Sequence, residues 1–297
     1  MSRTENTILM FSVILCWSTS YIFIKELPSS LPNFAYLTMN FGIAAILLTL
    51  IFFKKLRDIT KPLFLKSCIL GVLLTANLLF DKLGIDRLPP SMSSVFAASS
   101  ILIVPIIMIF LKKYPTKNNM IGAVILMIGI LITNGFDHTG LFTPGAAFMF
   151  LSALIASIYT IVADQITKEE DPILLTMLQM WISALISFVV WFTEEPMTFL
   201  TVDYNNEMLS SIFICSFFAK AYAYVALMYA QKYSDPIRIT IISATEPVVT
   251  LVLAVLIPSI FVEEFTVTAI VGAIVIMLGA VISGTDFLSY KRKKGNV

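Results

Sequence analysis

Ten apolar runs, each close to the length that crosses a lipid bilayer, dominate this sequence. They lie near residues 7–26, 33–53, 63–83, 91–112, 118–136, 145–166, 172–193, 207–231, 236–257 and 264–285. About 20 apolar residues at 1.5 Å rise per residue span the hydrocarbon core. Only 13% of the 297 residues are charged, whereas a soluble domain carries about 25%. The pattern predicts an all-α integral membrane protein of ten transmembrane helices, with no separate soluble domain.

The basic residues are concentrated in alternate connections between these runs. The connections on one side, together with both chain ends, hold 16 of the 20: Arg3, Lys54, Lys55, Arg57, Lys61, Lys66, Lys112, Lys113, Lys117, Lys168, Lys232, Arg238, Lys291, Arg292, Lys293 and Lys294. The other side carries acidic residues such as Glu194, Glu195 and Glu264. The positive-inside rule therefore predicts that both termini are cytoplasmic, in a multi-pass protein of the cell membrane.

A glycine pattern in the fifth run recurs in the tenth. Gly122 and Gly129 stand at the same spacing as Gly272 and Gly279, with matching apolar residues between them. Small residues of this kind also serve ordinary helix packing in lipid, but the runs before them are similar too. We interpret residues 1–137 and 138–297 as two five-helix repeats. An odd number of spans inverts the second repeat, an arrangement typical of secondary transporters.

Three short motifs carry a family resemblance. They are Cys-Trp-Ser-Thr-Ser-Tyr-Ile-Phe-Ile-Lys at 16–25, Tyr-Ala-Gln-Lys-Tyr-Ser at 229–234 and Glu-Pro-Val at 246–248. In order and spacing the chain resembles the EamA-type, ten-helix branch of the drug/metabolite transporter superfamily over nearly its whole length. It departs from that pattern at Ile101, at Met39-Asn40 and at Asp81-Lys82. These departures leave the substrate open.

Two charged residues lie near the middle of predicted spans, Lys220 in the eighth and Glu246 in the ninth. A charge at that depth costs roughly 2.5–3.5 kcal/mol on insertion scales and usually faces a cavity or a partner. Both residues are similarly distant from the connection near 232–236, so we expect them at one depth, as a possible ion pair. Lys220 is predicted to attract an anionic substrate group. Glu246 either poises that charge or supports the helix at Pro247.

Other polar and aromatic residues within spans are candidates for lining a substrate cavity. They are Trp17, Ser20, Tyr21, Asn40, Asn77, Ser157, Thr160, Gln179 and Tyr224. Each of them taken singly is equally explained by a hydrogen bond to a neighbouring helix. Asp81-Lys82 falls near the predicted outer face, where a surface ion pair or an outer gate is expected.

Several kinds of chemistry have no support in the sequence. There is no GxxxxGK[ST] loop and no HExxH motif, and the single histidine, His138, lies in a predicted loop. Cys16, Cys68 and Cys215 sit in apolar runs without metal-ligand spacing. The formal net charge of +1 gives no indication of nucleic-acid binding. We therefore expect no metal, no cofactor and no enzymatic activity.

The expected function is secondary transport by alternating access. The protein would export or facilitate small organic metabolites, and the family resemblance implies amino acids as the first substrate class. A passive channel is the main alternative and an intramembrane enzyme the weaker one. The expected partners are a small-molecule substrate and the lipid bilayer, with the chain acting as a monomer or a homodimer. Direction and coupling are not indicated.

Overall fold

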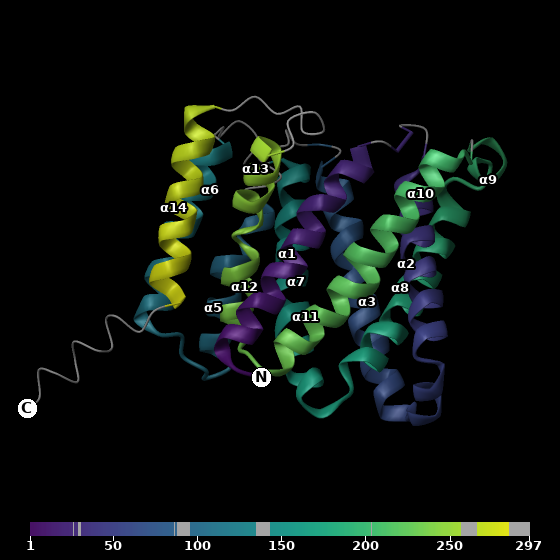
Figure 1. Ribbon diagram of the computed structural model, residues 1–297, viewed down its shortest axis with the longest axis horizontal. Coiled ribbons are helices and arrows are strands. Elements are labelled where there is room, and N and C mark those ends of the chain that lie inside the picture. The colour runs from purple at the N-terminus through teal and green to yellow at the C-terminus, as the bar shows by residue number, and fades with distance from the viewer. Residues whose placement is uncertain are drawn as a thin grey trace, which may run out of the picture. The chain divides into compact units, whose positions relative to one another are not determined.

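The computed structural model describes residues 1–25, 27–28, 31–85, 87, 96–134, 143–202, 204–256 and 266–284, which contain helices and no strand (Figure 1). The α-helices are α1 (Arg3–Lys25), α2 (Asn33–Ile51), α3 (Lys61–Ile85), α5 (Ser100–Phe110), α6 (Lys117–Asn134), α7 (Pro144–Glu169), α8 (Pro172–Glu194), α9 (Thr198–Thr201), α10 (Asn206–Ile214), α11 (Ala223–Lys232), α12 (Pro236–Ser243), α13 (Glu246–Leu256) and α14 (Val267–Gly284). A 3₁₀-helix, η1, covers Phe53–Asp58, and a π-helix, η3, covers Cys215–Tyr222. The all-helical prediction is confirmed.

Each apolar run of the sequence overlaps at least one described helix. Five helices are long and apolar enough to cross a membrane by length and composition: 33–51, 61–84, 144–169, 172–194 and 206–232. Three shorter apolar helices cover 96–110, 117–133 and 267–283. The number of ten crossings and the cytoplasmic termini remain predictions.

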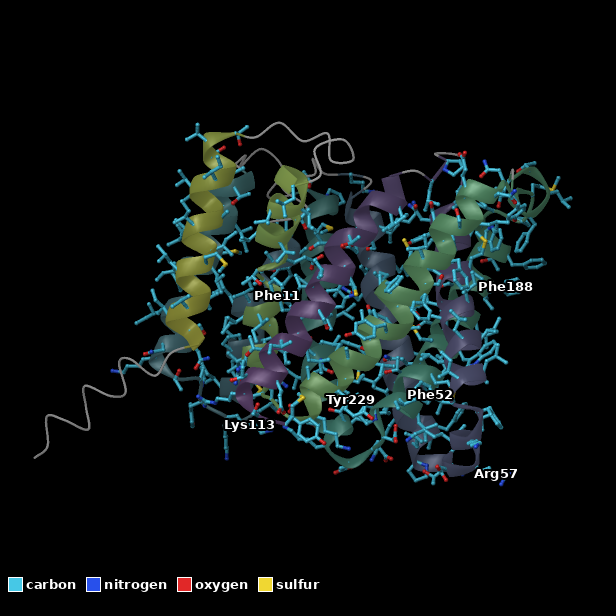
Figure 2. All side chains as sticks on the ribbon, in the orientation of Figure 1. Phe11, Phe52, Arg57, Lys113, Phe188 and Tyr229 are labelled. Atoms are coloured by element: carbon cyan, nitrogen blue, oxygen red, sulfur yellow. The ribbon has the colours of Figure 1, made fainter. Side chains whose placement is uncertain are left out.

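Large apolar side chains project from the helices without protein cover. Figure 2 labels Phe11 of α1 and Phe188 of α8, whose exposed fractions are 53% and 42%. Many leucines, isoleucines and valines on the other helices are similarly exposed. Contiguous apolar surface on this scale is not tolerated in water, and lipid tails are the solvent that accommodates it.

The chain forms two compact units. Unit 1 comprises residues 1–75 and 162–233, and unit 2 comprises residues 76–161 and 234–297. Each unit draws on both halves of the sequence, and each is described here by itself. The units are defined by contacts, whereas the repeats at 1–137 and 138–297 are defined by sequence, so those repeat boundaries remain a prediction.

Unit 2 is organised around a glycine seam where α6 and α14 pack side by side (Figure 1). A Cβ atom added to Gly129 would lie 2.7 Å from the backbone nitrogen of Ile276. One added to Gly279 would lie 2.7 Å from the backbone nitrogen of Leu126. Because no real Cβ tolerates that distance from backbone, only glycine permits this approach. The seam therefore gains close van der Waals contact between the two helix backbones.

The contacts across the glycine seam exchange under the sequence repeat. Gly122 faces Ser283, and its repeat counterpart Gly272 faces Thr133. The start of α6 thus meets the end of α14, so these equivalent helices run antiparallel. A local two-fold relation of this kind is what an inverted pair of repeats requires.

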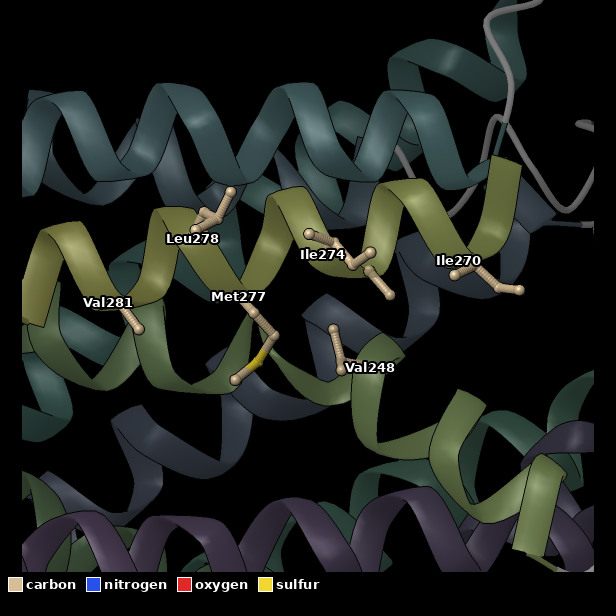
Figure 3. Close-up of a pocket in the computed structure, with 7 residues that line it drawn as sticks. Val248, Ile270, Ile274, Met277, Leu278 and Val281 are labelled. Atoms are coloured by element: carbon tan, nitrogen blue, oxygen red, sulfur yellow. The ribbon is translucent and has the colours of Figure 1, made fainter. Parts of the chain in front are cut away.

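Other helices of unit 2 pack on both members of the seam, α5 on α6 and both α12 and α13 on α14. The apolar core of unit 2 consists of Ile101, Val104 and Met108 of α5, Ala123, Leu126 and Ile130 of α6, Ile161 of α7, Ile237 and Ile241 of α12, and Ile276 of α14. A groove of about 330 Å³ lies between α13 and α14 (Figure 3). Only apolar side chains line it, from Val248 to Val281. A polar solute would find no hydrogen-bond partner there, so this groove is not the candidate site.

Unit 1 joins helices from both halves of the chain. The α1 helix packs against α11 through Val13, Ala223 and Ala226. At the start of α1, the Asn6 side chain donates a hydrogen bond of 2.8 Å to the Ala230 carbonyl. The α3 and α8 helices approach closely at Gly71, where an added Cβ would lie 2.7 Å from Ile182 Cγ2.

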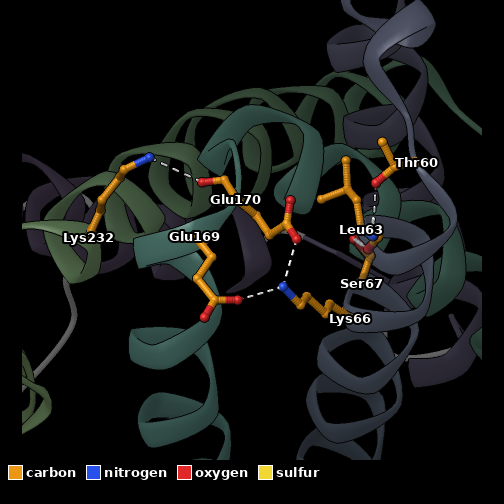
Figure 4. A network of polar contacts seen from close by, with 7 residues as sticks. All are labelled: Thr60, Leu63, Lys66, Ser67, Glu169, Glu170 and Lys232. Carbon is orange, nitrogen blue, oxygen red and sulfur yellow. Dashed lines mark hydrogen bonds and ion pairs between the residues drawn. The ribbon is translucent and has the colours of Figure 1, made fainter.

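One end of unit 1 is tied by a network of charges (Figure 4). Lys66 of α3 reaches between two carboxylates, 2.7 Å from Glu169 Oε2 and 2.7 Å from Glu170 Oε1. Lys232, at the end of α11, donates a hydrogen bond of 3.2 Å to the Glu170 carbonyl. Three helices that are distant in sequence are therefore held together at the α7–α8 connection.

Asp171 starts α8 and belongs to the same connection. Its carboxylate accepts hydrogen bonds from the backbone amides of Ile173 and Leu174, and it forms an ion pair with Lys55 of η1. Burial acts to raise the pKa of Asp171, but the Lys55 ammonium and the two amides outweigh it and hold the pKa below its ordinary value of 3.8. The hydrogen bond from the Lys55 ammonium to the Asp171 carboxylate raises the pKa of Lys55.

We expect Gly129→Ala to destabilise the protein by about 1–3 kcal/mol, because the added methyl group must force α6 and α14 apart. Thermal unfolding of the purified protein in detergent measures the effect. Gly42→Ala is the matched control, since nothing lies within 4 Å of a Cβ at Gly42 on α2. Equal melting temperatures for both variants would contradict the role of the glycine seam.

We expect Asp171→Asn to lower the melting temperature at neutral pH, because it keeps the helix cap and removes the charge. The folded-state pKa of Asp171 is depressed, so the stability that its charge supplies is present above about pH 3.9 and is lost as the pH falls through the folded value. The difference from wild type should therefore shrink in acid. Asp171→Ala also removes the cap and should cost about 1 kcal/mol more. A difference independent of pH would argue against this assignment.

Candidate functional site

Lys220 lies in an unusual stretch of helix. Between α10 and α11, the residues Cys215–Tyr222 form the π-helix η3, so the three segments make one continuous helix over residues 206–232. π-Helical turns are rare and occur frequently at functional sites, because they widen the helix and reposition side chains. The sequence gives no signal for this geometry.

The Lys220 ammonium contacts two aromatic rings in unit 1. Its Nζ atom lies 5.0 Å from the ring centroid of Phe41 and 5.3 Å from that of Tyr224. Phe41 is fully buried on α2. Among the described residues, Lys220 has no hydrogen bond and no ion pair. Within the described residues of unit 1, the site is therefore a cation held by π-faces, with no carboxylate paired to it.

We call the rings of Trp17, Phe41 and Tyr224 the aromatic wall of this site, and Trp17 is fixed in it by two contacts. Its Nε1–H donates a hydrogen bond of 3.1 Å to the carbonyl of Ala219, the residue before Lys220. Its ring lies 6.0 Å from the ring of Tyr224, centroid to centroid. Ser20 lies one turn further along α1 and donates a hydrogen bond of 2.7 Å to the Trp17 carbonyl. The structure thus brings Trp17, Lys220 and Tyr224 together, whereas the Ser20 hydroxyl bonds within its own helix.

Asn40, next to Phe41 on α2, is fully buried. Neither its side-chain oxygen nor its nitrogen has a hydrogen-bond partner among the described residues. The Tyr36 hydroxyl lies near the side chains of Asn40 and Cys215, but its position does not satisfy the geometry of a hydrogen bond to the Asn40 amide. A buried, unpartnered amide is costly unless something else satisfies it. Asn40 therefore has donors and an acceptor available for a ligand.

Two further candidates in unit 1 are less informative. Gln179 is fully buried on α8. Thr176, three residues earlier on the same helix, donates a hydrogen bond of 3.4 Å to the Tyr224 carbonyl. The backbone of Tyr21 is helical, but its side chain lies outside the described residues.

The remaining candidates belong to unit 2. Asn77 donates hydrogen bonds to the Ser152 hydroxyl at 2.9 Å and to the Ser152 carbonyl at 3.0 Å. Ser157 and Thr160 bond to carbonyls of their own helix, those of Ala153 and Ala156. These hydroxyls satisfy themselves locally, as packing residues do.

Glu246 begins α13 where the predicted ninth span is interrupted. The α12 helix ends at Ser243, and a turn at Ala244 and Thr245 precedes Glu246. A carboxylate at a helix N-terminus is favoured by the helix dipole. Lys220 lies in unit 1 and Glu246 in unit 2, so their pairing remains a prediction.

No group of three potential metal ligands occurs among the residues that the structure describes. The three cysteines are free thiols. His138 lies outside the described residues.

Sequence reasoning missed two residues that matter here. Phe41 and Tyr36 read as ordinary apolar helix residues, because nothing in the pattern aligns α2 with η3. Asp81 was expected near the outer face, in a surface ion pair or an outer gate, and the gate remains a prediction. The structure places Asp81 half-buried on α3, with its carboxylate against Ser152 of α7.

Comparisons with known proteins agree with one another. The model of the EamA-like transporter family matches residues 6–135 and 143–285. Two proteins of Archaeoglobus fulgidus, each described as an uncharacterized transporter, are 22% identical over 278 and 274 residues. These alignments cover 93% and 91% of this chain, and 97% and 82% of the relatives.

A solved crystal structure shares the fold at 18% identity, with a TM-score of 0.78 over 95% of this chain and 98% of that chain. The family match extends over two successive stretches that together take in nearly the whole sequence, and the curated relatives are transporters by description. The chain belongs to the EamA-like transporter family.

Proposed function

We propose that this protein is a secondary transporter of small organic metabolites that carry a carboxylate, with amino acids as the first substrate class. The observation that carries the proposal is the Lys220 ammonium, held between Phe41 and Tyr224 with no carboxylate paired to it in the described part of unit 1. A charge within a membrane span is costly in free energy, and such residues usually serve a function. A substrate carboxylate is the partner that this cation lacks.

The neighbouring groups suit an amphipathic metabolite. The rings of Trp17 and Tyr224 offer apolar contact to a side chain. The Asn40 amide offers hydrogen bonds to a second polar group. Charge-assisted hydrogen bonds are about twice as strong as neutral ones. Lys220 would therefore supply most of the affinity, and the aromatic wall and Asn40 would supply the selectivity.

Alternating access is the proposed mechanism. The antiparallel seam between α6 and α14 supports inverted repeats, and the interruption between α12 and α13 resembles the broken helices of secondary transporters. In this proposal ten spans cross the cell membrane with both termini in the cytoplasm. The repeats rock about the site and expose it to each side in turn.

Transport assays with purified protein in sealed lipid vesicles test the function. We expect saturable flux of at least one member of a radiolabelled amino-acid mixture, with the recovered solute chemically unchanged. Flux proportional to concentration without saturation would favour a channel. A modified product would favour an enzyme.

We expect Lys220→Ala to weaken binding of the transported amino acid about tenfold or more, because a hydrogen bond to a charged group contributes about 1.5–3 kcal/mol. Lys220→Arg keeps the charge and should retain part of the affinity. The half-saturation concentration for uptake and a thermal-shift titration both report the change.

Lys54→Ala is the matched control for Lys220→Ala. The Lys54 ammonium also lies over an aromatic ring, 6.0 Å from the Phe53 centroid, but Lys54 is exposed on η1. Its removal should leave transport unaltered. Wild-type affinity in the Lys220→Ala protein would remove Lys220 from the site.

A further inference from the structure

A carboxylate in unit 2 lies inside a membrane span with no role in the Lys220 site. Asp81 belongs to the apolar span 61–84 of α3 and is half-buried. It follows Asn77 by one helical turn, so both side chains occupy the same face of α3. On α7, Ser152 is buried and interacts with both of them.

The helices carrying these groups approach closely. A Cβ added to Gly84 would lie 3.1 Å from the backbone nitrogen of Met149, one turn before Ser152 on α7. Phe80 stacks on Phe148 with ring centroids 6.2 Å apart. Apolar groups and close backbone therefore surround the Asp81 carboxylate on the α7 side.

Two cations lie nearby, and neither pairs with Asp81 in the described part of the chain. Lys82 is the next residue on α3, but no ion pair joins it to Asp81. Arg87 donates a hydrogen bond of 2.7 Å to the Leu83 carbonyl and lies 5.3 Å from the Phe148 ring centroid. From α7, the group that faces Asp81 is the uncharged hydroxyl of Ser152.

Ser152 can respond to the charge of Asp81. Its single hydroxyl hydrogen has two acceptors within reach, the Asn77 carbonyl at 3.2 Å and the Asp81 carboxylate. An ionised carboxylate only accepts hydrogen bonds, whereas a protonated one also donates. In the structure the Ser152 hydroxyl donates to the Asn77 carbonyl, and ionisation of Asp81 adds a competing acceptor for the same hydrogen. The hydrogen bonding between α3 and α7 therefore changes with a single proton.

We propose that Asp81 is the proton-binding carboxylate that couples solute movement to a proton gradient, with Ser152 and Asn77 as its positioning residues. The carboxylate takes one proton from water on one side of the membrane and returns it to water on the other. No covalent bond of the solute changes. The inference rests on the proposed function, because coupling requires a transported solute.

Transport in vesicles tests the coupling with the same radiolabelled amino-acid mixture. Wild-type protein should accumulate solute when a pH difference is imposed, and Asp81→Asn should lose that accumulation while still exchanging labelled for unlabelled solute. Asp81→Glu keeps a titratable group and should restore part of the accumulation. Asp58→Asn, which changes an exposed carboxylate on η1, should behave as wild type. Accumulation by Asp81→Asn at the wild-type level would overturn the proposal.

A measurement without solute separates this proposal from the transport function. Infrared spectra of the purified protein in lipid, recorded across the pH range of the transport assay, should show a protonated-carboxyl band that Asp81→Asn lacks and Ser152→Ala displaces. Identical spectra for wild type and Asp81→Asn would overturn the proton site even if transport occurs. Absence of flux in every protein, with the band present, would instead overturn the transport function.

Discussion

The contact between α6 and α14 sets the geometry of unit 2. In lipid there is little hydrophobic drive between apolar helices, so association depends on close backbone packing. That packing comes from the four glycines of the seam, Gly122, Gly129, Gly272 and Gly279. The contacts are reciprocal: Gly129 faces Ile276, and its repeat counterpart Gly279 faces Leu126, the counterpart of Ile276. Because the contact is two-fold, it fixes the direction of both helices. The helices α5 and α12 then pack on the same core.

The low polarity of the surroundings gives the few buried polar groups their significance. Several charges that the structure describes in unit 1 are paired, as Lys66 and Asp171 are. In the same described part, the Lys220 ammonium lies over two aromatic rings without an ion pair, and the Asn40 amide has no hydrogen bond of good geometry. A chain does not retain such costs for stability, because a leucine at either position would remove them. In the proposed function, a polar ligand that binds at the site is the physical reason to keep both residues.

The sequence predicted the helices well and the site in part. Apolar length and flanking prolines determine where each helix lies, because the bilayer allows no other backbone arrangement. The glycine spacing predicted which helices correspond, and Lys220 was recognisable from its depth. The partners of Lys220 were not, because Phe41 reaches it only through the packing of α2 against the π-helix. The contact of Asp81 with Ser152 was not predictable for a similar reason, since the position of Ser152 depends on how α7 lies along α3.

The helices α3 and α7 connect these observations. Each contributes residues to both units, α3 up to Thr75 and from Ala76, and α7 up to Ile161 and from Val162. Within unit 1 the two helices are joined by Lys66 and Glu169, and within unit 2 by Asn77 and Ser152. A helix transmits displacement along its axis, because its backbone hydrogen bonds resist stretching. In the proposed mechanism, a change of charge at Asp81 acts on two helices that continue into the unit where Lys220 lies, so the chain itself would link the proposed proton site to the proposed solute site.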